Sequence, residues 1–187
     1  MNFAQYTLPG RRLCLALSVS AITTFVHAQD PAITWPAGWE IEALPAPPDT
    51  LATAPVQVRQ RAVKNDQAGN PGMVMELTQT RLAPGHQVNV QGVLLEMRKA
   101  VQINFARSGL QSACTQVRET RLSEVPALET TCTVTQNGVH VLTQTLVAAA
   151  SQKMAWSLSY AGSAKAYADS KEEVLRIRES VRLDSAP

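Results

Sequence analysis

The amino-acid sequence predicts an α+β fold, in which an antiparallel sheet of about six to seven strands packs with two main helices. Most of the chain consists of short runs that alternate in strand fashion and are separated by turn-forming residues. Two segments instead repeat apolar residues every three or four positions, which is the period of an amphipathic helix. Long antiparallel hairpins combined with two such helices are typical of an α+β sandwich.

The N-terminus has the three parts of a cleavable secretory signal. Arg11 and Arg12 form its positive end, Leu13–Val26 is apolar but too short for a good membrane span, and Ala28 ends a small-residue cleavage site. A twin-arginine signal fits the flanking residues poorly, and Cys14 lies at the wrong end of the apolar run for a lipid anchor. We therefore expect cleavage after Ala28 and a periplasmic mature protein.

This signal divides the chain into three segments: residues 1–28 are the signal peptide, 29–36 an N-terminal tail, and 37–187 a single α+β domain. The mature length of 187 − 28 = 159 residues suits one domain with a proper core. No later apolar run could span a bilayer, so no membrane span is expected in the mature form.

Removal of the signal also changes the charge of the chain. The whole sequence has 17 Lys and Arg against 15 Asp and Glu, and the signal contains two arginines and no acid, which leaves 15 against 15. A nucleic-acid binder needs surplus cations to displace counterions from phosphates, so nucleic acid is not an expected partner. Attachment to a membrane through a polybasic surface is disfavoured for the same reason.

The first half of the domain is predicted to form three strands and a helix. The strands cover Glu40–Leu44, Val56–Lys64 and Met73–Leu82; Pro45–Asp49 is a rigid connector, and a loop rich in turn formers joins the second and third strands. The helix begins near Val90, where apolar residues start to recur at three- and four-residue steps, and continues for about five turns. Ser108-Gly109 is a suitable stop for it.

The second half is predicted to form four strands and a C-terminal helix. Asn137-Gly138 is a strong hairpin signal, because both residues tolerate the positive φ of a type I′ turn. Ser170-Lys171-Glu172-Glu173 has the pattern of a capping box, followed by an amphipathic helix. The four strands are Gln111–Thr120, Ala127–Gln136, Val139–Ala148 and Met154–Ala161, with a turn at Leu122–Pro126 between the first two. The helix has Val174, Leu175, Ile177, Arg178 and Val181 on its packing side.

This order of elements resembles the PsbP-like α/β/α sandwich superfamily, which includes small bacterial envelope proteins of the DcrB type. The resemblance rests on the opening Trp35-Pro36-x-Gly38-Trp39 after a signal, an early hairpin, one long helix that ends near Gly109, and a strand meander before a final helix that ends in Ser180–Leu183. More narrowly, the chain looks like an uncharacterised family of exported bacterial proteins that share this opening. The resemblance implies the fold and a mostly non-enzymatic accessory or binding role, and it carries no site residue.

Cys114 and Cys132 are the two cysteines that remain after cleavage, an even number in an exported chain. They lie on consecutive predicted strands, and a turn centred near Ser123 would place them opposite one another, within disulfide range. A redox or metal pair is the alternative, with His140 as one further ligand, but no Cys-x-x-Cys spacing supports it. The sequence predicts a structural disulfide.

No catalytic, metal or cofactor site is predicted. His86, which is expected to open the long helix, and His140, expected on a strand face with Leu142 and Gln144, are the only histidines after cleavage, and they have no common motif. Ser151 with Lys153, and Ser163 with Lys165, have the spacing of a Ser–Lys dyad, but a catalytic lysine must be desolvated and both pairs lie at strand ends. Glu172-Glu173 fits the first turn of a helix, where acids suit the helix dipole.

Polar strand faces and two tryptophans are the remaining candidates for binding. Gln57, Arg59 and Arg61 share one face with a similar row at Thr78 and Thr80, while Thr131, Thr133 and Thr135 share another that should face Leu142 and Leu146. Such faces could bind a partner or a glycan, although threonine is also a good strand former on a wetted surface. Trp35 and Trp39 either form an exposed contact or cover a core edge; the second is favoured.

The sequence thus predicts a non-enzymatic periplasmic accessory or binding protein, whose partner is an envelope protein or a small ligand. The first alternative is a small-ligand binder with a pocket between the long helix and the sheet. A Ser–Lys hydrolase is a remote alternative.

Overall fold

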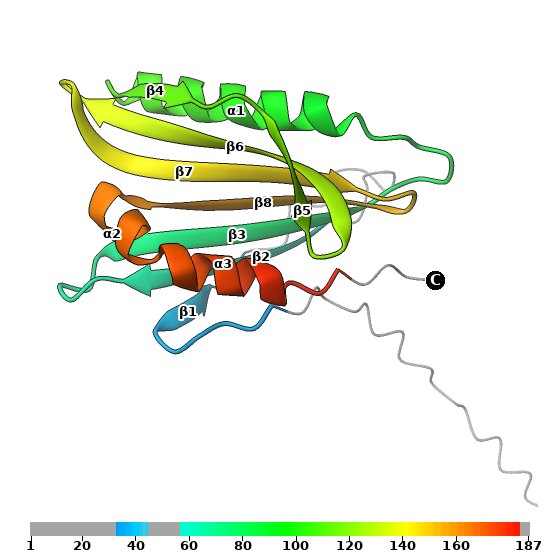
Figure 1. Cartoon of the computed structure of the whole chain (residues 1–187), viewed down its shortest axis with the longest axis horizontal. Helices are drawn as coiled ribbons and strands as arrows, with labels where there is room; N and C mark the ends of the chain where they lie inside the picture. The colour runs from blue at the N-terminus through cyan, green and yellow to red at the C-terminus, as the bar shows by residue number, and fades with distance from the viewer. Residues whose placement is uncertain (1–32, 43, 45–56, 184–187) are drawn as a thin grey trace, which may run out of the picture.

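The described part of the chain forms one eight-stranded antiparallel sheet with helices on both faces (Figure 1). The computed structural model describes residues 33–42, 44 and 57–183; the predicted signal and the connector Pro45–Asp49 lie outside them. The strands follow the order β1-β2-β3-β8-β7-β6-β4, and β5 also pairs with β6. None of the described helices is long and apolar enough to cross a membrane. The predicted α+β class is confirmed.

The elements begin and end close to the predicted boundaries. The strands are β1 (Trp39–Glu42), β2 (Gln57–Asn65), β3 (Pro71–Arg81), β4 (Gln111–Cys114), β5 (Arg118–Leu122), β6 (Val125–Gln136), β7 (Val139–Ala150) and β8 (Met154–Ser163). The helices are α1 (Val90–Arg107), α2 (Ala164–Asp169) and α3 (Lys171–Ser180). Compared with the prediction, the described residues contain one extra strand, because the run Gln111–Thr120 is divided, and one extra short helix, α2.

The division between β4 and β5 brings the two cysteines together. Arg118 pairs with Glu129 in β6, and an unbroken strand in that register would place Cys114 opposite Thr133. The residues between β4 and β5 contain one more residue than the matching stretch of β6, so the register shifts by one and Cys114 pairs with Cys132. The predicted disulfide is present in the structure.

The two faces of the sheet bury different residues. Along β7, Leu146 and Ala148 pack with Leu94 of α1, whereas the alternate residues Val147 and Ala149 join the core under α2 and α3. In Figure 1, α1 lies along the β4 end of the sheet. The larger core, on the α2 and α3 face, includes Trp39, Met73, Met75, Leu77, Leu122, Met154, Trp156, Leu158, Tyr160, Val174, Ile177 and Val181.

The N-terminal tryptophans belong to this larger core. Trp39 is buried, its ring lies 5.7 Å from that of Trp35, and Trp35 and Ile33 pack against the core cluster. The backbone N–H of Thr34 also donates to Ser180 at the end of α3, at 3.1 Å. The tryptophans therefore cover a core edge, as the sequence favours, and part of the predicted tail packs on the folded domain.

Local signals explain the ends of α1 but not the start of α3. The Asn89 side chain accepts a hydrogen bond from the backbone N–H of Gly92 at 3.0 Å, and Gly109, with a φ of 74°, follows the helix. At α3 the predicted capping box is wrong, since Ser170 makes no side-chain cap. Ser170 also ends α2, its near-helical backbone donates to Ala166, and Glu173 instead pairs with Lys64 of β2.

A buried ion pair joins α3 to the sheet. Arg178 donates to the Glu129 carboxylate, to the Thr120 hydroxyl at 2.6 Å and to the Arg121 carbonyl oxygen at 2.9 Å. The side chain of Glu129 is 2% exposed, and its other oxygen accepts from Arg118. Because both oxygens of this buried carboxylate are hydrogen-bonded to cations, its desolvation is compensated.

We predict that replacing Arg178 strongly destabilises the protein. The buried carboxylate of Glu129 would lose the more buried of the two cations that compensate for its desolvation. Arg178→Met should lower the free energy of unfolding by about 3 kcal/mol, measured by urea titration. Arg176→Met is the control, since Arg176 is an exposed arginine on the same helix. Equal unfolding midpoints for the two variants would contradict the role assigned to the ion pair.

The disulfide should stabilise the fold only under oxidising conditions. Its cysteines are 18 residues apart, so closure of this loop should add about 3 kcal/mol to the free energy of unfolding. Adding a thiol reductant should lower the wild-type stability by that amount and leave the double variant Cys114→Ala, Cys132→Ala unchanged. A wild type that is indifferent to the reductant would show that the pair contributes nothing to stability.

Candidate functional site

One half of the α1 face of the sheet has no helix packed on it among the described elements. A helix is about 10 Å wide and strands lie about 4.8 Å apart, so a helix that runs along the strands covers only two or three of them. α1 packs on β4, β6 and β7, whereas α2 packs on the opposite face of β7, β8 and β3. On the α1 face of the sheet, β8, β3 and β2 therefore have no described helix packed on them.

Strand β8 forms the floor of this open half. Its large side chains all point to the covered face, where Trp156 and Leu158 are buried. The side chains that point to the open face are small, and they are Ala155, Ser157, Ser159 and Ala161. Because the side chains on this face of β8 are small, the surface between α1 and β3 is recessed.

A groove of about 660 Å³ follows from this arrangement. One wall is the N-terminal half of α1, where Val93 is 40% exposed and Met97 is half-buried. The opposite wall consists of polar side chains of β2 and β3, which are Gln57, Thr78 and Thr80. Ser157 lies on the floor, in register with Thr78 on one side and Ala148 on the other.

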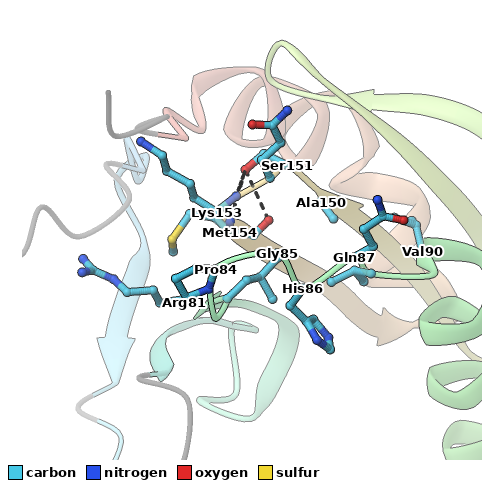
Figure 2. A pocket seen from close by; sticks show the side chains of 13 residues that line it. Arg81, Pro84, Gly85, His86, Gln87, Val90, Ala150, Ser151, Lys153 and Met154 are labelled. Carbon is cyan, nitrogen blue, oxygen red and sulfur yellow. Dashed lines mark hydrogen bonds between the residues drawn. The ribbon is translucent and has the colours of Figure 1, made fainter.

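A second hollow of about 980 Å³ lies beside the groove at the start of α1, and Figure 2 shows the side chains that line it. The loop that leads into α1 and the turn between β7 and β8 form its two rims. His86, Gln87 and Val90 line both hollows, so the two adjoin one another. The groove lies beside the long helix, against the sheet, in the region where the alternative function predicts a ligand pocket.

The walls of the groove carry hydrogen-bonding groups with little charge. Beyond its polar wall, Arg59 donates to Glu76 at 2.6 Å and Arg61 pairs with Glu42 at 3.0 Å, so both arginines of the predicted polar face are neutralised. Glu96 is the one ionic side chain in the lining of the groove, among the residues that the structure describes. The surface therefore suits an uncharged or alternately apolar and polar ligand.

Both serines of the two Ser–Lys spacings, and one of the lysines, have local structural roles. Ser163 accepts from the Ala166 backbone N–H at 3.1 Å and caps α2, while Lys165 is exposed and pairs with Asp169. Ser151 closes the β7–β8 turn, because its hydroxyl accepts from the Met154 backbone N–H at 3.2 Å. An exposed lysine stays hydrated and charged, which is unfavourable for a general base.

The two histidines lie on different elements, His86 in the loop before α1 and His140 in β7. His86 is in the loop before α1, not in the helix as expected, and in Figure 2 its ring points away from Ser151. His140 was expected on the face of Leu142, and this is wrong, because an irregularity at Val134 and Thr135 shifts the register. His140 instead contacts the Thr143 hydroxyl at 2.8 Å.

The predicted threonine row on β6 lies on the covered face of the sheet. Thr131 pairs with Thr145 and Thr133 with Thr143, so the expectation that this row faces Leu142 and Leu146 is wrong. The one-residue irregularity in the β6–β7 hairpin explains the error. Thr145 is 1% exposed, and its hydroxyl lies 2.8 Å from that of Thr131 and 2.5 Å from that of Tyr167 in α2.

These threonines belong to a polar cluster around the Glu129 ion pair, which sequence analysis missed. Burial raises the pKa of Tyr167 to about 12, and its ring stacks 5.9 Å from that of Tyr160. The hydrogen bond to Glu129, together with its charge, raises the pKa of Arg118. The sequence does contain a pattern that indicates this cluster. Arg178 falls within the apolar stripe of α3, and a cation at such a position needs a buried partner of opposite charge. No three His, Cys, Asp or Glu side chains of the described chain gather as metal ligands.

Comparisons with known proteins identify a family and a fold. Residues 30–183 match the model of a family described as a domain of unknown function, DUF4946. Among solved structures, the chain is similar to the solution structure of cyanobacterial PsbP (CyanoP) from Synechocystis sp. PCC 6803, with a TM-score of 0.55 and 9% identity. That match covers 81% of this chain and 85% of the other, and it confirms the PsbP-like fold alone. No curated protein matches the sequence.

Proposed function

The chain belongs to the DUF4946 family, and from its predicted signal peptide, its PsbP-like fold and its open groove we propose that it is an exported, non-enzymatic accessory protein that binds an envelope partner. The groove beside α1 is the observation that carries this proposal. It is open, Glu96 is the one ionic side chain of its lining among the described residues, and it combines an exposed apolar wall with a polar one. Within the PsbP-like group, the proposal puts the chain with the small bacterial envelope proteins of the DcrB type.

The groove favours recognition of a partner through its lining side chains rather than through backbone hydrogen bonds. Its floor and polar wall come from β8, β3 and β2, and β8 and β3 are internal strands whose backbone groups are paired on both sides. A partner segment therefore gains no strand pairing there, unlike a segment added at a sheet edge. Gln57, Thr78 and Ser157 offer hydrogen bonds to an extended segment, and Val93 and Met97 offer apolar contacts. The small floor residues allow its backbone to approach closely.

A small ligand in the same groove is the second candidate. The groove volume lies within the range of about 300–1,000 Å³ that is typical of small-molecule sites. Such sites cover most of their ligand, however, whereas this groove is open along its length. An extended partner segment uses an open groove more fully than a compact molecule does.

We predict that blocking the floor of the groove abolishes partner capture. Ser157→Arg places a long cation between α1 and β3, so a partner that mature wild-type protein captures from envelope extract should be lost. Thr133→Arg is the matched control, because Thr133 is an exposed strand residue on the opposite face. Quantitative mass spectrometry measures the capture, and melting temperatures verify that both variants are folded.

Capture that persists equally in Ser157→Arg would contradict binding in the groove. If the purified protein instead carries a small molecule, native mass spectrometry should show its added mass on wild type and on Thr133→Arg but not on Ser157→Arg. That result would replace the partner by the second candidate.

Export makes a separate prediction. The periplasmic protein should start at Gln29, and Ala28→Arg should leave the uncleaved precursor, because the peptidase requires a small residue there. N-terminal sequencing of the periplasmic fraction measures this. A product that keeps Met1–Ala28 in the cytoplasm would contradict the proposed location.

A further inference from the structure

A small cavity of about 110 Å³ lies beneath α3, on the face of the sheet opposite the groove. Its charged lining consists of Arg118, Arg178, Lys171 and Glu129, and its neutral polar lining consists of two threonines and two tyrosines. Arg178 and Glu129 form the inner end, while Arg118 and Lys171 are exposed side chains at the mouth. The groove and this cavity share no residue.

Hydrogen-bond donors outnumber acceptors in this cavity. Glu129 is the single carboxylate of the lining, and Arg118 and Arg178 already occupy its two oxygens. Arg118 uses Nε and Nη2 for this contact, which leaves the donors of Nη1. The hydroxyls of Thr131, Thr145 and Tyr167 form a chain of two hydrogen bonds, and the Tyr160 hydroxyl interacts with Tyr167 at its end. A chain of hydroxyls has one more proton than it has internal hydrogen bonds, so one proton is left for an acceptor outside the chain.

The same lining is positively charged. Three cations and one carboxylate give a formal net charge of +2. Burial holds the pKa of Tyr167 at about 12, so this phenol stays neutral and remains a donor at physiological pH. A partly enclosed site with excess positive charge and excess donors attracts an acceptor-rich anion.

We propose that this cavity binds a small oxyanion, of the phosphate or carboxylate class, between the mouth cations and the hydroxyl chain. Nη1 of Arg118 and the Lys171 ammonium would donate to it from the mouth, and the spare hydroxyl proton from the inner side. The volume admits several waters or one such anion and is far below that of a nucleotide or lipid site. Because the mouth cations come from β5 and α3 and the hydroxyl chain from β6, β7 and α2, the bound anion links these elements and stabilises the folded state.

Titration of the mature protein with inorganic phosphate at constant ionic strength tests the proposal. We expect saturable binding with a Kd at or below about 1 mM by calorimetry, and a melting temperature that rises with phosphate but not with chloride. Arg118→Gln should weaken phosphate binding by about tenfold or more, the effect of one charge-assisted hydrogen bond. Arg59→Gln is the matched control, since Arg59 also pairs with a glutamate but on the opposite face, and it should bind phosphate as wild type does.

One further variant and one further anion make the result decisive. Lys171→Gln tests the mouth at an exposed position where folding is not at risk, and should also weaken binding severalfold. Acetate in place of phosphate separates carboxylate from tetrahedral anions, and binding of either one supports the proposal. Absence of saturable binding by both anions, or equal weakening in Arg59→Gln, would overturn it.

Discussion

The width of a helix limits how much of this sheet the chain can cover, and the arrangement of the molecule follows from that limit. Eight strands present two faces, and the described helices supply α2 and α3 for one face but only α1 for the other. α1 therefore packs on the β4, β6 and β7 part of its face and leaves the rest beside it. The candidate groove is this uncovered part together with the exposed flank of α1.

The residues on each face of the sheet match the extent to which helices cover that face. On the open half, β8 carries only alanine and serine, and the arginines of β2 pair with glutamates of neighbouring strands. On the covered face the same strand supplies Trp156 and Leu158 to the core. Such a strand tolerates water on one side and a packed interior on the other. The polar Glu129 cluster is the exception within the covered face, and its hydrogen bonds compensate for the burial of its charges.

Much of the fold was predictable because the local signals agree with the tertiary structure. Turn residues at Asn137-Gly138 and the 3.6-residue period after Val90 identify a hairpin and α1 without further information. The errors in strand extent and in strand face occur where one residue changes a register. The break before Arg118 divides a predicted strand, and the irregularity near Thr135 moves His140 and the threonine row. A one-residue shift reverses the face of every following side chain, and no composition signal marks it.

The sequence by itself determined the α+β class, most strand boundaries and the long helix, since these depend on alternation, period and turn residues close together in the chain. It also identified the two cysteines of the disulfide from their even number, whereas the register shift that places them opposite one another belongs to the tertiary structure. Only the tertiary structure decided which half of the sheet stays open and which buried groups meet. Arg178 and Glu129 are 49 positions apart, and Tyr167 reaches Thr145 from another element. Such contacts depend on strand order and helix placement, which arise from packing of the whole sheet rather than from local patterns.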